Sequence, residues 1–463
     1  MWLCGQVSWP QRERVTGDCT FNTFRSRSWF RRSIPPESMG GTSAVRKKSQ
    51  HAMPSDGRRP ALHAGGGFVR IHSCSLLIRT WVTLRPGSWL VVLSAALTPT
   101  QVLSGLPDET EQNPLWHYGA YVDFNYAPDF NTPHSVPFRS KLTTYRLNQV
   151  STDLAMAYIS KDASFDSPLG FEFGLMTGWD MSGQMPTSNI MSEASIIEHL
   201  ARANITYQTS VGNGLKLVGG LMSSFIGYEA FYAKDNTHYS RAWGSDYSPY
   251  YLIGVGAIYP VTSKILTGAY IVTDYNYLQV INSQPKYAGQ FSYQIDDHLK
   301  WSENLFVGPE QSNTAFEYWR GFLNSILEYD AGQWSVAFIG DAGSQKSAQP
   351  GHVQQLYAAS SIFGRWNIEG PWTLGLRPEI YYDPNAVQTG NIQFIKALTS
   401  TLEYKVIASG ITTRIRLEYR FDNSTGTQGG FYGPEGIQGS LVPSQSVIYM
   451  GLLMNFDGGF DLP

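Results

Sequence analysis

Hydrophobic and polar residues alternate along much of the chain from residue 115 onward. In residues 116–126, Trp116 and Phe124 fall on one side of the alternation, and Tyr121 and Asp123 fall on the other. A period of two places successive side chains on opposite faces of a β-strand. The same pattern recurs in the segments 168–180, 371–383 and 411–422.

This periodicity predicts an all-β fold with about 16 strands, and counts from 14 to 18 stay open. Each strand is long enough to cross an apolar layer when tilted. The predicted strands are 115–127, 146–159, 168–180, 198–207, 214–225, 250–260, 264–274, 286–296, 298–308, 318–330, 332–343, 353–368, 371–383, 394–407, 410–422 and 446–456.

The connections between these strands alternate in length. Short turns such as 208–213 and 369–370 follow the even-numbered strands, whereas long loops such as 128–145, 181–197 and 423–445 follow odd-numbered ones. Aromatic residues also stand near the ends of the apolar faces, as expected for side chains at a membrane–water interface. Because lipid offers no hydrogen-bond partners, a sheet within it must close on itself. We therefore predict a transmembrane up-and-down antiparallel β-barrel with both termini at the periplasmic side.

Composition fits this prediction. Aromatic residues make up 14% of the chain and charged residues only 15%, below the proportion in most soluble domains. Residues 1–86 carry 14 Lys and Arg against four acids, which leaves 20 basic and 33 acidic residues in the rest. All three cysteines, Cys4, Cys19 and Cys74, also lie in the basic segment. The remainder can therefore hold neither a disulfide framework nor a thiol metal site.

The basic N-terminal segment has two interpretations. It could be a nucleic-acid-binding arm, but it shows no helical or strand periodicity and the chain after it looks exported. We favour a start codon placed too early, with the true start near Val69 or Val82. From Arg79 the chain then has a basic stretch and a short apolar run, 88–97, typical of a secretory signal.

These features divide the chain into five parts. Cleavage of the signal is expected before Gly105. The parts are a disordered basic extension at 1–78, a signal peptide at 79–104, a short linker at 105–114, an outer-membrane β-barrel at 115–456 and a C-terminal tail at 457–463.

Several segments of the predicted barrel match a known family. They are 118–126 (YGAYVDFNY), 145–148 (YRLN), 227–236 (GYEAFYAKDN), 246–250 (DYSPY), 403–405 (EYK) and 416–422 (RLEYRFD). With these segments, the sequence resembles the OmpL-like β-barrel porins over about 115–456. The resemblance implies a bacterial outer-membrane barrel with a pore. It supplies no substrate and no catalytic residue.

Charged side chains are predicted on the inward face of the strands near the C-terminus. One hypothesis is a basic stripe that steers anionic solutes. The alternative, which we favour, is a ladder of paired charges that stiffens the wall. The pore-lining candidates are Arg365, Arg377, Glu379, Glu403, Arg414, Arg416, Glu418 and Arg420, with Asp422 beside them.

The long loop 226–249 is rich in aromatic rings. It could fold inward and narrow the pore, or it could pack on itself at the surface. The candidates for a constriction are Tyr228, Phe231, Tyr232, Tyr239, Trp243 and Tyr247.

The sequence thus predicts an outer-membrane channel for passive diffusion of small hydrophilic solutes. A non-conducting barrel that acts as an adhesin or structural anchor is one alternative, and a barrel-embedded hydrolase is another. None of the six histidines after residue 105 has hydrolase or metal-site spacing, so no catalytic residue, metal or cofactor is predicted. The expected partners are outer-membrane lipid and solutes, not nucleic acid, and homo-oligomer formation stays open.

Overall fold

The computed structural model describes residues 115–133, 137–184, 198–273, 275, 282–311 and 314–461. The predicted basic extension, signal peptide and linker, 1–114, lie outside the described residues. Most of the strands below form where apolar and polar residues alternate, because that pattern suits a sheet with lipid on one side and a polar interior on the other.

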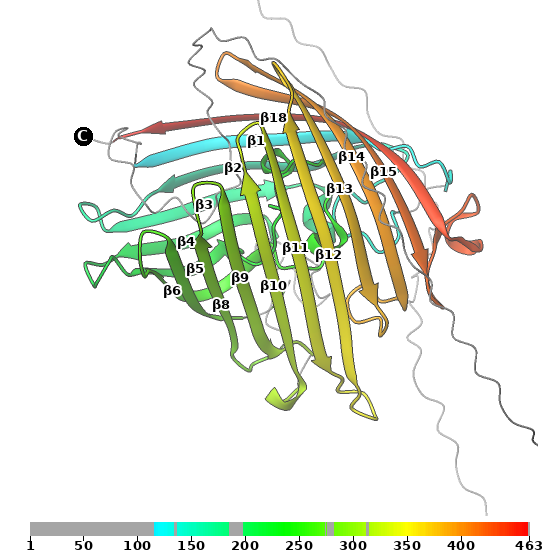
Figure 1. The fold of residues 1–463 in the computed structure, drawn as a ribbon, viewed down its shortest axis with the longest axis horizontal. Helices are drawn as coiled ribbons and strands as arrows, with labels where there is room; N and C mark the ends of the chain where they lie inside the picture. Colours follow the sequence, from blue (N-terminus) through cyan, green and yellow to red (C-terminus); the bar gives the residue numbers. More distant parts are fainter. Residues whose placement is uncertain are drawn as a thin grey trace, which may run out of the picture. The chain divides into compact units, whose positions relative to one another are not determined.

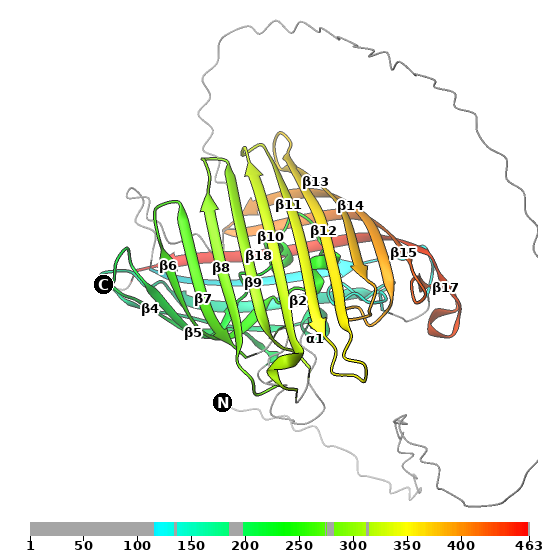
Figure 2. The same cartoon turned by 60° about the horizontal axis from the view of Figure 1, so that its bottom comes forward.

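Sixteen strands form the wall of the barrel (Figures 1 and 2). They are β1 (Trp116–Tyr126), β2 (Val150–Lys161), β3 (Leu169–Thr177), β4 (Leu200–Gln208), β5 (Lys216–Ser223), β6 (Tyr251–Pro260), β7 (Ile265–Val272), β8 (Lys286–Gln294), β9 (Leu299–Pro309), β10 (Trp319–Asp330), β11 (Trp334–Lys346), β12 (Gln354–Asn367), β13 (Trp372–Asp383), β14 (Gln393–Ala408), β15 (Ile411–Thr425) and β18 (Ser444–Phe460).

The sheet is a closed barrel in which every strand pairs with its neighbours in the chain. β1 and β18 complete the closure by pairing antiparallel, from Trp116 opposite Phe460 to Tyr126 opposite Met450. The predicted fold class and the count of 16 strands are confirmed. Closure leaves no sheet edge without hydrogen-bond partners in lipid, as the prediction from the sequence required.

The residues on the two faces of the wall are those that the alternation predicted. On β1, Tyr118 and Phe124 are exposed on the outer surface, whereas Tyr121 and Asp123 are buried inside. Aromatic rings cluster outside near the turn end of the strands, where Trp116 stacks on Phe460 with ring centroids 5.7 Å apart. The outer surface therefore presents apolar residues with aromatic rings at the strand ends.

Two strand boundaries differ from the prediction by four residues, more than any other. β2 begins at Val150, not at 146, because residues 137–147 bend inward and bury Phe138 and Leu147. β18 continues to Phe460, within the predicted tail, because its alternation continues and it finds a partner in Trp116.

Short elements lie in the long loops. A two-stranded sheet of β16 (Phe431–Tyr432) and β17 (Leu441–Val442) lies between β15 and β18. The helices α1 (Trp179–Gln184) and α3 (Trp243–Asp246) each have at most six residues. Within the described ranges, no helix has the length and apolar character needed to cross a membrane.

Long and short connections fall at opposite ends of the barrel. The loop end carries long connections such as 127–149, 224–250 and 426–443, and the turn end carries short ones such as 409–410. In the outer-membrane orientation predicted from the sequence, the short turns face the periplasm and the loop end faces outward.

Candidate functional site: a loop held inside the barrel

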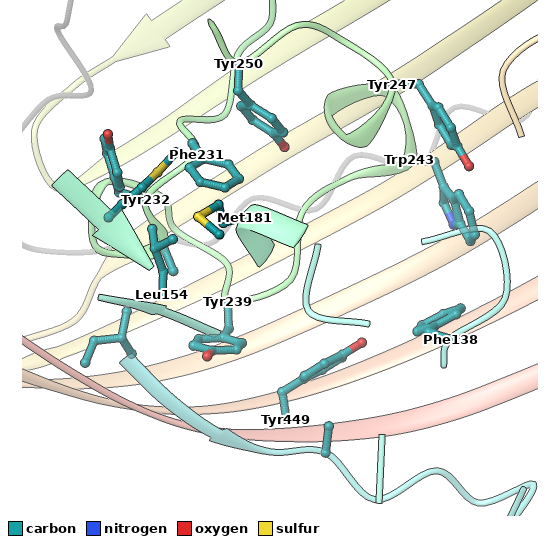
Figure 3. Packing of buried hydrophobic residues seen from close by; sticks show 14 of the residues in the cluster. Phe138, Leu154, Met181, Phe231, Tyr232, Tyr239, Trp243, Tyr247, Tyr250 and Tyr449 are labelled. Atoms are coloured by element: carbon teal, nitrogen blue, oxygen red, sulfur yellow. The ribbon is translucent and has the colours of Figure 1, made fainter. Parts of the chain in front are cut away.

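The connection 224–250 between β5 and β6, here called the inner loop, lies inside the barrel. Its Tyr239 hydroxyl donates to Asp153 on β2 at 2.9 Å, and its Trp243 indole N–H donates to Asp422 on β15 at 2.7 Å. Tyr239 and Trp243 are fully buried, and Figure 3 shows the Tyr239 ring close to that of Tyr449 on β18. A surface position for this loop, one of the two alternatives, does not agree with these contacts.

The structure brings the six aromatic candidates of this loop together within the lumen. Five of them are buried, and Tyr228 is partly buried with its ring 4.7 Å from that of Phe363. Phe231 and Tyr232 pack against Tyr251, and Tyr247 packs against Tyr381. The five buried rings, with Phe138 and Met181 from two other loops, belong to one apolar cluster (Figure 3). Tyr228 packs against a separate cluster that contains Phe363.

Acidic side chains of the wall accept hydrogen bonds from the backbone of the inner loop. Glu418 on β15 accepts from the N–H groups of Tyr239 at 2.6 Å and Ser240 at 2.9 Å. Glu379 on β13 accepts from the N–H of Trp243 at 2.5 Å. A loop within a barrel has lost water as a partner, and these carboxylates replace it.

Arginines of the same wall satisfy the carbonyl groups of the loop. Arg416 donates to the carbonyls of Ala233 at 2.7 Å and Asn236 at 2.6 Å. Arg377 donates to Ser240 O at 2.7 Å, and Arg420 donates to Arg241 O at 2.8 Å. The carboxylates of the wall therefore bind N–H groups of the inner loop, and the guanidinium groups bind its carbonyl groups.

The same charged side chains are paired with one another. Arg420 lies 3.1 Å from Glu379, Arg377 lies 3.3 Å from Glu379, and Arg416 lies 2.6 Å from Glu403. Such pairing removes the free positive charge that a stripe for anions would need. The geometry supports the paired-ladder interpretation, and it adds a role in holding the loop that sequence reasoning missed.

Two pore-lining candidates, Arg365 and Arg414, pair with residues of the wall. Arg365 on β12 pairs with Asp330 at 3.0 Å. Arg414 on β15 donates to Asn455 at 2.6 Å and lies 3.9 Å from Glu403. All eight candidates therefore lie on the inward face, but most of them bind the loop or each other.

Residues of the first long loop complete the site, and sequence reasoning missed them. Lys141 forms a buried ion pair with Asp246 and donates to Arg241 O at 2.8 Å. Asp246 also accepts from the hydroxyl of Thr143 at 2.6 Å. These partners are about a hundred residues apart in sequence, so no local pattern could indicate them.

Burial controls the ionisation of groups in the loops. It lowers the pKa of His238 well below its usual value, and neighbouring guanidinium groups, including Arg416, act in the same direction. The neutral imidazole shares a hydrogen bond with the Thr401 hydroxyl through Nδ1, at 2.8 Å. Burial also lowers the pKa of Lys141, an effect that the carboxylate of Asp246 opposes.

A second apolar cluster inside the barrel extends along the wall from β5 to β12. Tyr275, which follows β7, is fully buried between the rings of Phe306 and Phe322. Its hydroxyl donates to Tyr247 O at 2.7 Å and so links this cluster to the inner loop. Sequence reasoning missed Tyr275, because nothing in the apolar strand before it marks a buried ring at this position.

Below these clusters, at the turn end, the lumen contains a cavity of about 410 Å³ lined by β3–β8, the end of β2 and the connecting turns. It lies across the barrel from β13 and β14, the strands that help to hold the inner loop. Among the described residues, no group of three or more His, Cys, Asp or Glu side chains could hold a metal ion.

A closed antiparallel barrel of 16 strands with a long loop inside its lumen is the architecture of an outer-membrane porin. This chain belongs to the family described as "Putative beta-barrel porin-2, OmpL-like", whose model matches residues 116–456. The protein is thus an outer-membrane β-barrel of the porin class, located in the bacterial outer membrane. The family expected from the sequence is confirmed.

Solved structures of several outer-membrane proteins are similar to this chain. The channel DcaP of Acinetobacter baumannii is 11% identical, with 74% of this chain and 96% of that chain covered and a TM-score of 0.49. The Salmonella typhi OmpF complex with daunomycin is 10% identical, with 74% and 97% covered and a TM-score of 0.49. The anion-selective porin from Comamonas acidovorans is 14% identical, with 74% and 100% covered and a TM-score of 0.43. No curated protein matches the sequence significantly.

Proposed function

We propose that this protein is a channel for the passive diffusion of small hydrophilic solutes across the outer membrane. The observation that carries the proposal is the asymmetric filling of the lumen. The inner loop is bound to one wall through Glu418, Arg416 and Arg377, and a cavity remains beside the opposite wall. A loop held in this way narrows a pore to a defined width, which selects solutes by size.

In this proposal the charged candidates act in two ways. Arg377, Glu379 and Glu418 hold the loop and set the width of the passage. Arg365 and Arg414, which pair with residues of the wall, line the pore and act on solutes directly. Charged groups on a pore wall favour ions of opposite sign.

One observation favours the alternative of a plugged barrel that serves as an adhesin or structural anchor. The described inward-facing rings at the loop end, including Tyr275, Phe306 and Phe322, are almost completely buried. Conduction therefore requires a path past this cluster. No arrangement among the described residues favours a hydrolase, and an activity screen on lipid and peptide substrates tests that alternative.

Recordings in planar lipid bilayers decide between a channel and a plug. We expect the purified, refolded protein to produce stepwise conductance increments that persist at constant voltage. A parallel recording with the same detergent and heat-denatured protein controls for leaks. Complete absence of steps from correctly folded protein would contradict the channel and support the plugged barrel. The mass of the detergent-solubilised protein tests homo-oligomer formation separately.

A further inference from the structure

The cavity at the turn end has an apolar floor inside the barrel. Val218 on β5, Ile258 on β6 and Leu266 on β7 line it. The register places Val218 opposite Gly256 and Ile258 opposite Gly268, so Val218, Ile258 and Leu266 are diagonal neighbours on three adjacent strands. The interior of an outer-membrane barrel is normally polar. An apolar strip in contact with water in the lumen therefore indicates a surface for an apolar part of a ligand.

Two stacked aromatic rings close one end of this floor. Phe225 and Tyr270 lie with ring centroids 4.5 Å apart and an interplanar angle of 27°. A Cβ atom on Gly256 or Gly268 would overlap the Tyr270 ring, so the two glycines make room for it against the wall. The Tyr270 hydroxyl donates to Gln290 at 2.9 Å. The ring pair is therefore held in a fixed position.

Positive charge surrounds the apolar floor. Lys161, Lys216, Lys264 and Arg202 line the cavity, against two acids. Arg202 is paired with Glu172 at 3.2 Å. Among the described residues, Lys216 has no carboxylate within ion-pair distance. It lies opposite Ile258 in the strand register and thus beside the floor. Lys216 is the cation best placed to meet a ligand.

We propose that this cavity is a recognition site for small organic anions with a flat apolar body, of which an aromatic carboxylate is the simplest. The carboxylate would lie at Lys216, and the flat body would lie on Val218 and Ile258 with its edge toward the Phe225–Tyr270 pair. Arg416, Arg377 and Arg420 of the opposite wall cannot serve this purpose, because the inner loop and neighbouring acids occupy them. The inference deepens the proposed channel function by naming the solute class.

Benzoate is the probe for the experiment, with benzylammonium as the probe of opposite charge. Saturation-transfer NMR on the folded protein in detergent measures binding without requiring conduction. We expect benzoate to bind and benzylammonium not to bind. Lys216→Gln and Phe225→Ala should each weaken benzoate binding roughly fivefold, through loss of one charge and of one stacked ring. Lys405→Gln removes a lysine at the turn end outside the cavity and should leave binding unchanged.

Each outcome separates this site from the channel function. Equal binding of benzoate and benzylammonium overturns the site even if the protein conducts. So does the same benzoate binding by Lys216→Gln as by the control Lys405→Gln. Benzoate binding by a protein that shows no conductance supports the site and overturns the channel. Tyr270→Phe keeps the stacked ring and removes only its hydroxyl, so it should bind benzoate even if Phe225→Ala fails to fold.

Discussion

Deletion of residues 229–245 is expected to raise the single-channel conductance. This segment contains most of the inner loop, including Tyr239 and Trp243, which are fully buried in the lumen. The strands of the barrel pair with one another and not with this loop, so the wall should close without it. Water would then enter the space and hydrate Glu418 and Arg416. Conductance steps in planar bilayers at fixed salt provide the measurement.

A matched deletion controls for the loss of any loop at this end of the barrel. Residues 434–440 form the tip of the hairpin between β16 and β17, and most of them are exposed. Removing them should leave the conductance step unchanged. If the 229–245 deletion leaves the step at the wild-type value while the barrel folds, the inner loop does not limit the passage.

The wall of the barrel could be predicted almost entirely from the sequence. Alternation is a local property, and strands such as β1 and β15 carry it without interruption, so their faces and approximate limits follow directly. The alternation also predicted that Arg416 and Glu418 face the lumen from the same strand. The pattern predicted about 16 strands and left 14 to 18 open, because a segment such as 264–274 has apolar residues on both faces.

The contents of the lumen could not be predicted in the same way. The inner loop was a candidate for insertion because of its aromatic rings, but rings also suit a self-packed surface loop. The decisive contacts, such as that of Arg416 with Asn236 O, join residues far apart in sequence. They involve backbone groups of the loop, which carry no residue-specific signal. The cavity at the turn end was missed because Val218 and Ile258 look like ordinary strand residues.

Glu418→Ala is expected to destabilise the protein more than any other single change at the site. The buried carboxylate accepts from the N–H groups of Tyr239 and Ser240, from the Ser240 hydroxyl and from the Thr401 hydroxyl at 2.6 Å. Removing it leaves these donors unpaired in a dry environment. We expect a loss of about 3–5 kcal/mol in the free energy of unfolding, measured by urea unfolding in lipid vesicles. Glu418→Gln keeps one acceptor oxygen and should lose less.

The protein that lacks residues 229–245 shows whether Glu418 stabilises the fold by holding the inner loop. If its main role is to hold the inner loop, Glu418→Ala should cost only about 1–2 kcal/mol in the protein that lacks 229–245, because the bond from Thr401 alone remains to be lost. Glu435→Ala, which removes an exposed acid at the tip of the β16–β17 hairpin, controls for the loss of a carboxylate and should change stability little. An equal loss from Glu418→Ala in both backgrounds would mean that this carboxylate stabilises the wall itself, and the inner loop would then need another anchor.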